Sequence, residues 1–313
     1  MMSSEIIKME MLTDSLVITA SLDHTMRVWN IFENKLMFEI PLNKPIQNLA
    51  IVPGKYLIGV IGQKGVYQTQ QLYVWDSIIN QFDQSDVQLH GRYELDQQVL
   101  CLCVMSFTNE KYLVLGTQHG DLIIWDLETF EMSDELSLHN GNAINDIKEC
   151  KINFRLKSCL ITGSSDGTIK IISMRFDQQK FVELAQLNCG KREDIVSVAE
   201  LRNYMIVGAT RHQLYFWVLD NIKKPLKVQN THTMPIYKII SVDDGQFVLS
   251  VGTDGKLGVW KGKNQKLAYH SHPLHNQAIT DIVKIGDRIV TTSLDKTLRI
   301  HEIVYLFNNH EWV

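Results

Sequence analysis

Short runs of apolar and β-branched residues recur along the chain in pairs, and a polar turn joins the two runs of each pair. The first clear pair is Ile18–Trp29, with the sequence ITASLDHTMRVW, and its second run ends on tryptophan. Residues that alternate in polarity or branch at Cβ suit a pleated strand. The pattern therefore predicts a two-stranded hairpin.

The same unit returns six more times. The copies are Leu57–Trp75, Leu113–Trp125, Leu160–Ile172, Ile206–Trp217, Val248–Trp260 and Ile289–His301. Counted from Trp29, their last residues lie 46, 50, 47, 45, 43 and 41 positions apart. A period of roughly 40–50 residues, with hairpins that end on tryptophan, is typical of propeller blades. A single hairpin is marginally stable in water, so we expect each copy to bury a face against its neighbours.

The turns of these hairpins carry aspartate at positions 23, 166, 254 and 295, and glycine follows directly in two of them. Asp–Gly between apolar runs is a strong hairpin signal, because both residues tolerate a left-handed backbone. Four copies end in a related tripeptide: VWN at 28–30, VWD at 74–76, IWD at 124–126 and VWK at 259–261. In these positions the chain resembles the WD40-repeat β-propeller family, which has its Trp–Asp dipeptide there.

The resemblance implies an all-β fold, a seven-bladed β-propeller of four-stranded antiparallel blades that forms a single domain over residues 1–313. We expect the blades at about 5–42, 46–96, 98–138, 143–188, 195–229, 235–271 and 278–313. Family members usually complete the last blade with an N-terminal strand. Here Glu5–Met11 already reads as an inner strand, so we expect the C-terminal segment Val304–Val313 to supply the last outer strand. The alternative is that this apolar segment docks on a partner.

Composition narrows the possible functions. The 313 residues suit seven blades of about 45 residues each, and 45% of them are apolar, which is enough for a core. A net charge of −4 gives no electrostatic field that would attract nucleic acid or an anionic membrane surface to the protein alone. No apolar run is long enough to span a membrane.

Five cysteines without a CxxC pair favour free buried thiols in a reducing compartment. We therefore expect an intracellular, cytoplasmic protein, and the alternative is a nuclear or cytoskeletal location.

The resemblance also implies a structural hydrogen-bond network in each blade, made of a histidine, a Ser or Thr, the turn aspartate and the tryptophan. Our assignment is Ser21, Asp23 and Trp29 in blade 1; His139, Ser164 and Asp166 in blade 4; His232, Asp254 and Trp260 in blade 6; and His275, Ser293 and Asp295 in blade 7. Each set is incomplete; blade 6, for example, has Gly252 at the expected hydroxyl position. Because Ser, His and Asp recur blade after blade, we interpret them as structural, and we predict no catalytic, cofactor-binding or metal-binding residue. Zinc at His270 and His272 is the alternative considered for YHSHPLH.

Two segments of blade 5 predict a candidate interaction surface. In a propeller, the loops that enter the inner strands lie on the same face as the central hairpin turns, so Lys191 and Arg192 should lie near Arg211 and His212. Arg211 stands where other blades have the turn aspartate, as His119 does in blade 3. The insertion in blade 2 should add Lys64 and Tyr67 to that face. This set predicts a surface for an acidic segment of a partner protein, and the alternative is a group of solvated turn charges.

These observations predict a non-catalytic protein–protein interaction scaffold, a structural subunit of a larger assembly, with other proteins as its partners and no cofactor. The rings of such folds bind through their loops. Two alternatives remain. One is a substrate-recognition adaptor for a ubiquitin ligase or another enzyme. The other is a subunit of a ribosomal, RNA-processing, cytoskeletal or ciliary complex.

Overall fold

The structure is a computed structural model that describes residues 4–62, 70–77, 87–107, 110–150, 159–175, 180–190, 193–202, 205–219, 225–228 and 232–302. These residues form β-strands and connecting turns, and no α-helix occurs among them. Two compact units can be distinguished. Unit 1 comprises residues 1–96, 253–256 and 271–313, and unit 2 comprises residues 97–252 and 257–270. The expectation of a single domain stays a prediction.

Unit 1 contains the strands of blades 1, 2 and 7. Blade 1 is β1 (Ile6–Met11), β2 (Leu16–Ser21), β3 (Thr25–Asn30) and β4 (Lys35–Pro41). Blade 2 is β5 (Ile46–Val52), β6 (Tyr56–Ile61), β7 (Gln70–Ser77) and β8 (Val87–Leu95). Blade 7 has three described strands, β25 (Ile279–Ile285), β26 (Arg288–Ser293) and β27 (Leu298–Glu302). The segment Val304–Val313, expected to close this blade, lies outside the described residues.

Unit 2 contains the strands of blades 3 to 6. Blade 3 is β9 (Val99–Phe107), β10 (Glu110–Thr117), β11 (Asp121–Asp126) and β12 (Met132–Ser137), and blade 4 is β13 (Ile144–Cys150), β14 (Cys159–Ser164), β15 (Thr168–Arg175) and β16 (Lys180–Asn188). Blade 5 is β17 (Ile195–Leu201), β18 (Met205–Thr210), β19 (Leu214–Val218) and β20 (Leu226–Val228), and blade 6 is β21 (Ile236–Val242), β22 (Phe247–Gly252), β23 (Leu257–Lys261) and β24 (Lys266–His270).

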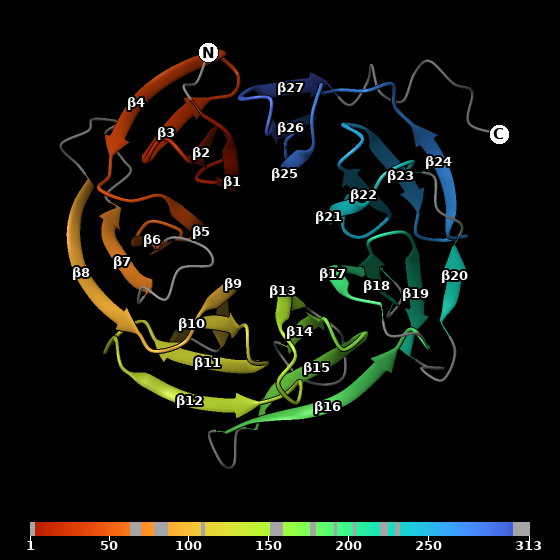
Figure 1. The fold of residues 1–313 in the computed structure, drawn as a ribbon, viewed down its shortest axis with the longest axis horizontal. Helices are drawn as coiled ribbons and strands as arrows, with labels where there is room; N and C mark the ends of the chain where they lie inside the picture. Colours follow the sequence, from red (N-terminus) through yellow and green to blue (C-terminus); the bar gives the residue numbers. More distant parts are fainter. Residues whose placement is uncertain are drawn as a thin grey trace. The chain divides into compact units, whose positions relative to one another are not determined.

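Each sheet is an antiparallel meander in chain order, as the repeated hairpins predict. In unit 2 the first strands β9, β13, β17 and β21 lie on one side, and the fourth strands β12, β16, β20 and β24 lie on the other (Figure 1). The predicted fold class is confirmed: the chain is all-β and has the seven-bladed β-propeller fold, with four-stranded antiparallel blades apart from the three described strands of blade 7. The tryptophan copies therefore mark the third strand of a blade.

A one-residue irregularity occurs near the start of every first strand. In blade 4, for example, Ile144 pairs with Ser164 and Asp146 with Gly163, so Asn145 is skipped. The other six first strands skip their second residue in the same way. Such a bulge disrupts the ladder locally and redirects side chains. In β13 and β17 the third residue, Asp146 or Ser197, is directed at the next blade.

The redirected side chain caps the backbone of its neighbour. Asp146 accepts a hydrogen bond from the backbone N–H of Val198 at 3.0 Å and another from the hydroxyl of Ser197 at 2.7 Å. Ser197, the third residue of β17, in turn accepts from the N–H of Ile239 at 3.2 Å. A buried N–H without a partner is costly, so these caps help to join adjacent blades.

Blade 7 packs against blade 1 within unit 1. The buried carboxylate of Asp281 accepts from the N–H of Met9 at 3.1 Å, and Arg288 donates to the carbonyl of Ile31 at 2.8 Å while its guanidinium lies over the ring of Phe32. Met9, Val17, Ile31, Ile285 and Val290 form an apolar cluster between the two sheets. Side-chain packing therefore connects the first blade to the last.

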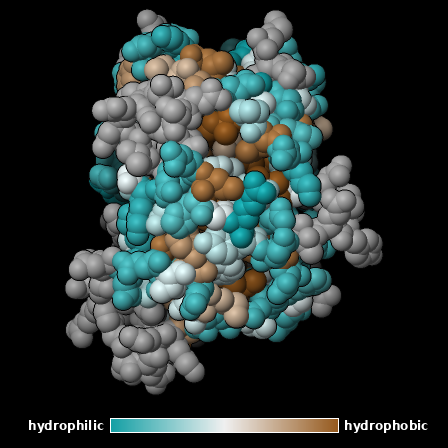
Figure 2. Space-filling view, turned by 90° about the vertical axis from the view of Figure 1, so that its left-hand side faces the viewer, coloured by the Kyte–Doolittle hydropathy of each residue, from teal (hydrophilic) through white to brown (hydrophobic). Residues whose placement is uncertain are grey.

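The described surface carries mainly polar residues on the face drawn in Figure 2, where hydrophobic residues form several separate patches. Small, separate apolar patches of this kind are normal for folded proteins. Among the described residues, no helix is long and apolar enough to cross a membrane.

Candidate functional site

The hydrogen-bond network of blade 4 is buried. His139, with no exposed surface, donates from Nδ1 to Asp166 at 2.8 Å, and its Nε2 lies 2.9 Å from the hydroxyl of Thr162. Thr168 also donates to Asp166 at 2.7 Å. Burial alone would raise the pKa of Asp166, but the bonds from His139 and Thr168 outweigh it and lower that pKa. The imidazole therefore locks the hairpin turn to the loop that enters the blade.

Blade 7 repeats this arrangement in unit 1. His275 donates to Asp295 at 3.0 Å, and its Nε2 lies 2.8 Å from the hydroxyl of Thr291. His301 occupies the place of the tryptophan and lies 3.1 Å from the same hydroxyl. Burial, with a smaller effect of the neighbouring His275, lowers the pKa of His301 to about 4. Blade 7 therefore keeps this histidine uncharged at neutral pH.

The network hydroxyl lies two residues before the position that the sequence suggested. Ser164 and Ser293 accept a hydrogen bond from the backbone N–H of the turn aspartate, at 3.2 and 3.0 Å, and Ser21 does the same in blade 1 at 3.3 Å. The ring-binding hydroxyls are Thr162 and Thr291. Residues two apart on a strand share a face, which is why the sequence pattern does not distinguish the two positions.

The same shift applies to the blades with tryptophan. In blade 6, Ser250 accepts from Trp260 Nε1 at 2.9 Å and lies 2.9 Å from His232 Nε2, so Gly252 does not leave the blade without a hydroxyl. In blade 1, Trp29 Nε1 donates to Thr19 at 3.0 Å. Zinc at His270 and His272 was the alternative considered for this region. In the structure the ring of His270 packs edge-on against His232, with centroids 5.3 Å apart.

Blade 5 departs from this pattern. Gly208 takes the hydroxyl position, two residues after Ile206, the register partner of Trp217. The indole N–H of Trp217 is buried and has no hydrogen-bond partner among the described residues. A Cβ atom at Gly208 would lie 2.6 Å from Cδ1 of Ile169 and 3.2 Å from the indole, so a serine would not fit without rearrangement. Arg211 replaces the turn aspartate. The turn of blade 5 therefore places a basic side chain at the surface, where other blades have the aspartate of the internal network.

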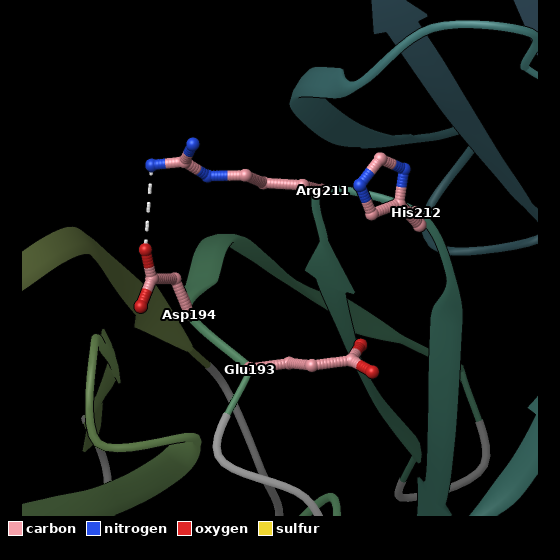
Figure 3. A pocket seen from close by; sticks show the side chains of 4 residues that line it. All are labelled: Glu193, Asp194, Arg211 and His212. Atoms are coloured by element: carbon pink, nitrogen blue, oxygen red, sulfur yellow. Dashed lines mark hydrogen bonds and ion pairs between the residues drawn. The ribbon is translucent and has the colours of Figure 1, made fainter.

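A shallow pocket of about 300 Å³ opens at this turn, lined by Glu193, Asp194, Arg211 and His212 (Figure 3). The Arg211 guanidinium reaches across to the Asp194 carboxylate at 3.4 Å, and the side chains are 64% and 38% exposed. The two acidic residues come from the loop before β17, and the two basic ones from the turn between β18 and β19. The pocket therefore combines carboxylate, guanidinium and imidazole groups.

The backbone beneath these side chains is well braced. The hydroxyl of Thr210 accepts hydrogen bonds from the N–H groups of His212 and Gln213, at 3.4 and 3.1 Å. The carbonyl of Arg211 accepts from the N–H of Ile236 at 2.7 Å, which ties the turn to the entry of blade 6. Beside that bond, Met234 and Tyr237 are 52% and 50% exposed. A braced turn thus presents an arginine, and the segment bonded to its backbone carries exposed Met and Tyr side chains.

The predicted surface residues fall into three groups. Arg211 and His212 lie together in the pocket, and His119 is exposed in the turn between β10 and β11 but does not line it. Lys191, Arg192, Lys64 and Tyr67 lie outside the described residues. Sequence reasoning missed the carboxylates of Glu193 and Asp194, although both stand in the loop sequence CGKRED.

Comparisons with known proteins agree with the geometry. Residues 223–261 match the model of the WD domain, G-beta repeat. The chain is 23% identical over 324 residues to a WD repeat-containing protein 91 homolog from Dictyostelium discoideum, covering 98% of this chain and 39% of that protein.

Two further relatives show the same kind of similarity. Spindle assembly checkpoint protein bub3 from Schizosaccharomyces pombe is 24% identical over 49% of this chain and 43% of its own length, and E3 ubiquitin-protein ligase COP1 from Arabidopsis thaliana is 23% identical over 64% and 28%. The chain thus spans less than half the length of each of these three relatives. Its repeated blades and these similarities support the assignment of the chain to the WD40-repeat family.

Proposed function

We propose that this protein is a non-catalytic protein-interaction scaffold, a structural subunit of a larger assembly, which binds an acidic segment of a partner at the pocket of blade 5. The observation that carries the proposal is the braced turn that exposes Arg211 and is bonded to the segment with the exposed side chains of Met234 and Tyr237. Arg, Tyr and Met are enriched at protein interfaces, and rigid presentation reduces the entropy that binding costs.

The ion pair in the pocket supports an acidic partner. Arg211 and Asp194 are both solvent-accessible, and such surface pairs contribute only about 0–1 kcal/mol. A carboxylate from a partner can therefore replace Asp194 at little cost, and a bidentate contact to the guanidinium would be stronger once water is excluded. Glu193 and Asp194 would then disfavour a segment with too many negative charges, which gives the surface some selectivity.

A non-catalytic role is supported by the burial of the Ser, His and Asp sets. His139 and His275 are at most 2% exposed, and both ring nitrogens of each are engaged by an aspartate and a threonine. A general base must reach the proton that it abstracts, and these imidazoles face the interior of their blades. They support the fold.

A second candidate is a substrate-recognition adaptor for a ubiquitin ligase. The observation in its favour is the similarity to COP1, named an E3 ubiquitin-protein ligase, and to Protein SPA1-RELATED 3 of Arabidopsis thaliana. For both candidates we propose an intracellular, cytoplasmic location, which the five cysteines, all in the thiol form, support.

The test is affinity purification from native cells with mass spectrometry, comparing the wild type with the Arg211→Glu single variant and the Arg192→Glu/Arg211→Glu double variant. Lys263→Glu is the matched control, since Lys263 is an exposed cation in the turn between β23 and β24. We expect both arginine variants to bind the partner at least about tenfold more weakly and the control to keep it. An unchanged set of partners in both arginine variants would overturn the proposed surface. Recovery of ligase subunits would favour the adaptor.

A further inference from the structure

Two of the five cysteines face each other across a strand pair. Cys150 is the last residue of β13, Cys159 is the first residue of β14, and the two are register partners. The other cysteines have no such relation: Cys101 pairs with Gly116 and Cys103 with Val114. Cys189 follows β16 and donates its N–H to Gly167, at the opposite end of blade 4. Only one pair is therefore arranged for a cross-strand link.

Register partners already satisfy most of the geometry of a disulfide. Residues directly opposite in an antiparallel pair have Cα atoms about 4.5–5.5 Å apart, and disulfides span Cα distances of about 4.4–6.8 Å. Partners also point to the same face of the sheet. Cys150 and Cys159 are 1% and 0% exposed, in an apolar cluster with Ile161 and Val198 that spans blades 4 and 5. The bond can therefore form with small movements of the two side chains.

The surroundings also activate one of the thiols. The hydrogen bond from Cys150 lowers the pKa of Cys159 to about 7, against the opposing effect of burial and of the Glu200 carboxylate. Ser173, the register partner of Cys159 on β15, adds a second hydrogen bond. By contrast, burial raises the pKa of Cys103 to about 12. Because the thiolate is the nucleophile, Cys159 is the more reactive sulfur at neutral pH.

We propose that Cys150 and Cys159 form a reversible intramolecular disulfide when the protein meets a peroxide. The Cys159 thiolate attacks one oxygen of hydrogen peroxide, the O–O bond breaks, and protonation of the leaving hydroxide gives water and a sulfenic acid. The Cys150 sulfur then attacks Cys159 and displaces the hydroxyl group as a second water. In sum, two thiols lose two electrons and two protons, and peroxide is reduced to two waters.

The link would join the open ends of two adjacent strands. It would close the loop of residues 151–158 and fasten the first hairpin of blade 4 beside the core shared with blade 5. The burial of both sulfurs makes local opening of the strand ends a condition for reaction, so oxidation is slower than at an exposed thiol. The link adds a covalent, redox-dependent brace.

The test treats the folded wild type with hydrogen peroxide, blocks remaining thiols with N-ethylmaleimide, and digests with trypsin without reductant. Lys151, Arg155 and Lys157 separate the two cysteines, so the disulfide appears as two joined peptides with two fewer hydrogen atoms. We expect this species, its loss with dithiothreitol, and a rise in Tm of about 5 °C on oxidation.

Variants sharpen the result. Cys150→Ser should abolish the joined peptides and leave Cys159 at the sulfenic or a higher oxidation state, whereas Cys189→Ser should still form the link. The proposal is overturned if the wild type yields oxidised Cys159 without the joined peptides, if it links only between molecules, or if both thiols remain reduced throughout. The wild-type experiment is sufficient even if a variant fails to fold.

Discussion

Blades 4 and 5 are adjacent and share a core, yet their central turns are built in different ways. In blade 4 a buried histidine binds the turn aspartate and a strand hydroxyl. In blade 5 a glycine and an arginine stand at the equivalent positions, and the turn is held by the hydroxyl of Thr210. The first arrangement stabilises the blade, and the second frees side chains for the surface. The contrast shows that a blade can lose its internal network if the turn is braced locally.

The strongest test of this contrast removes the imidazole of blade 4. His139→Ala leaves the partly buried Asp166 and the buried hydroxyl of Thr162 without their ring partner, so we expect a loss of about 3 kcal/mol in the free energy of unfolding. Urea unfolding measures it. His212→Ala in blade 5 is the control and should cost less than about 0.5 kcal/mol. Equal losses in the two variants would contradict the comparison.

A second variant tries to give blade 5 the missing hydroxyl. Gly208→Ser should cost about 2 kcal/mol, because the new Cβ meets Cδ1 of Ile169. The double variant Gly208→Ser/Ile169→Val removes that methyl group and allows a bond to Trp217 Nε1. We expect it to recover most of the loss, as a double-mutant cycle of unfolding free energies would show. No recovery would mean that the indole cannot use the hydroxyl.

In blade 7 the partly buried histidine His301 makes the stability of the fold depend on pH. The pKa of His301 is about 4 in the folded protein, below its usual 6.5, so the unfolded chain binds the extra proton first as the pH falls. Stability from this group is fully present above pH 6.5 and is lost progressively between pH 6.5 and about 4. We expect the Tm of the wild type to fall more over this range than that of His301→Phe. Parallel Tm curves would rule out this contribution.

The smallest effect is expected at the exposed turn. Arg211→Ala should change the free energy of unfolding by less than about 0.5 kcal/mol, because its ion pair with Asp194 is solvent-accessible. Thermal unfolding at low and high salt measures this, and both should match the wild type closely. A larger loss would make Arg211 part of the structure of blade 5 and weaken its assignment to a binding surface.

The repeated hairpins were predictable because two periodicities coincide in the sequence. Alternation of period two marks the strands, and the tryptophan at Trp29 and its equivalents marks the third strand of each blade. The turn aspartates were recognised for the same reason. These signals are local, so they survive in a single sequence.

The hydroxyl that binds the ring depends on a contact that the pattern of its own strand does not contain. Thr162 and Ser164 lie on the same face of β14, and only the position of His139 shows which one meets the ring. The carboxylates of Glu193 and Asp194 were not predicted, because the basic residues beside them in the sequence indicated an acidic partner. The skipped residue Asn145 of β13 has no marker in the sequence of blade 4, because its consequence is the contact of Asp146 with blade 5.

The caps between first strands have a consequence for protein engineering. Asp146 is matched to Ser197 and Val198, whereas Ser197 is matched to Ile239, so each joint is specified by two blades together. Transplanting one blade to a new site would bring the wrong partner to both of its borders. An exchanged segment should therefore begin in the middle of one blade and end in the middle of the next. The contacts between the two blades then stay together.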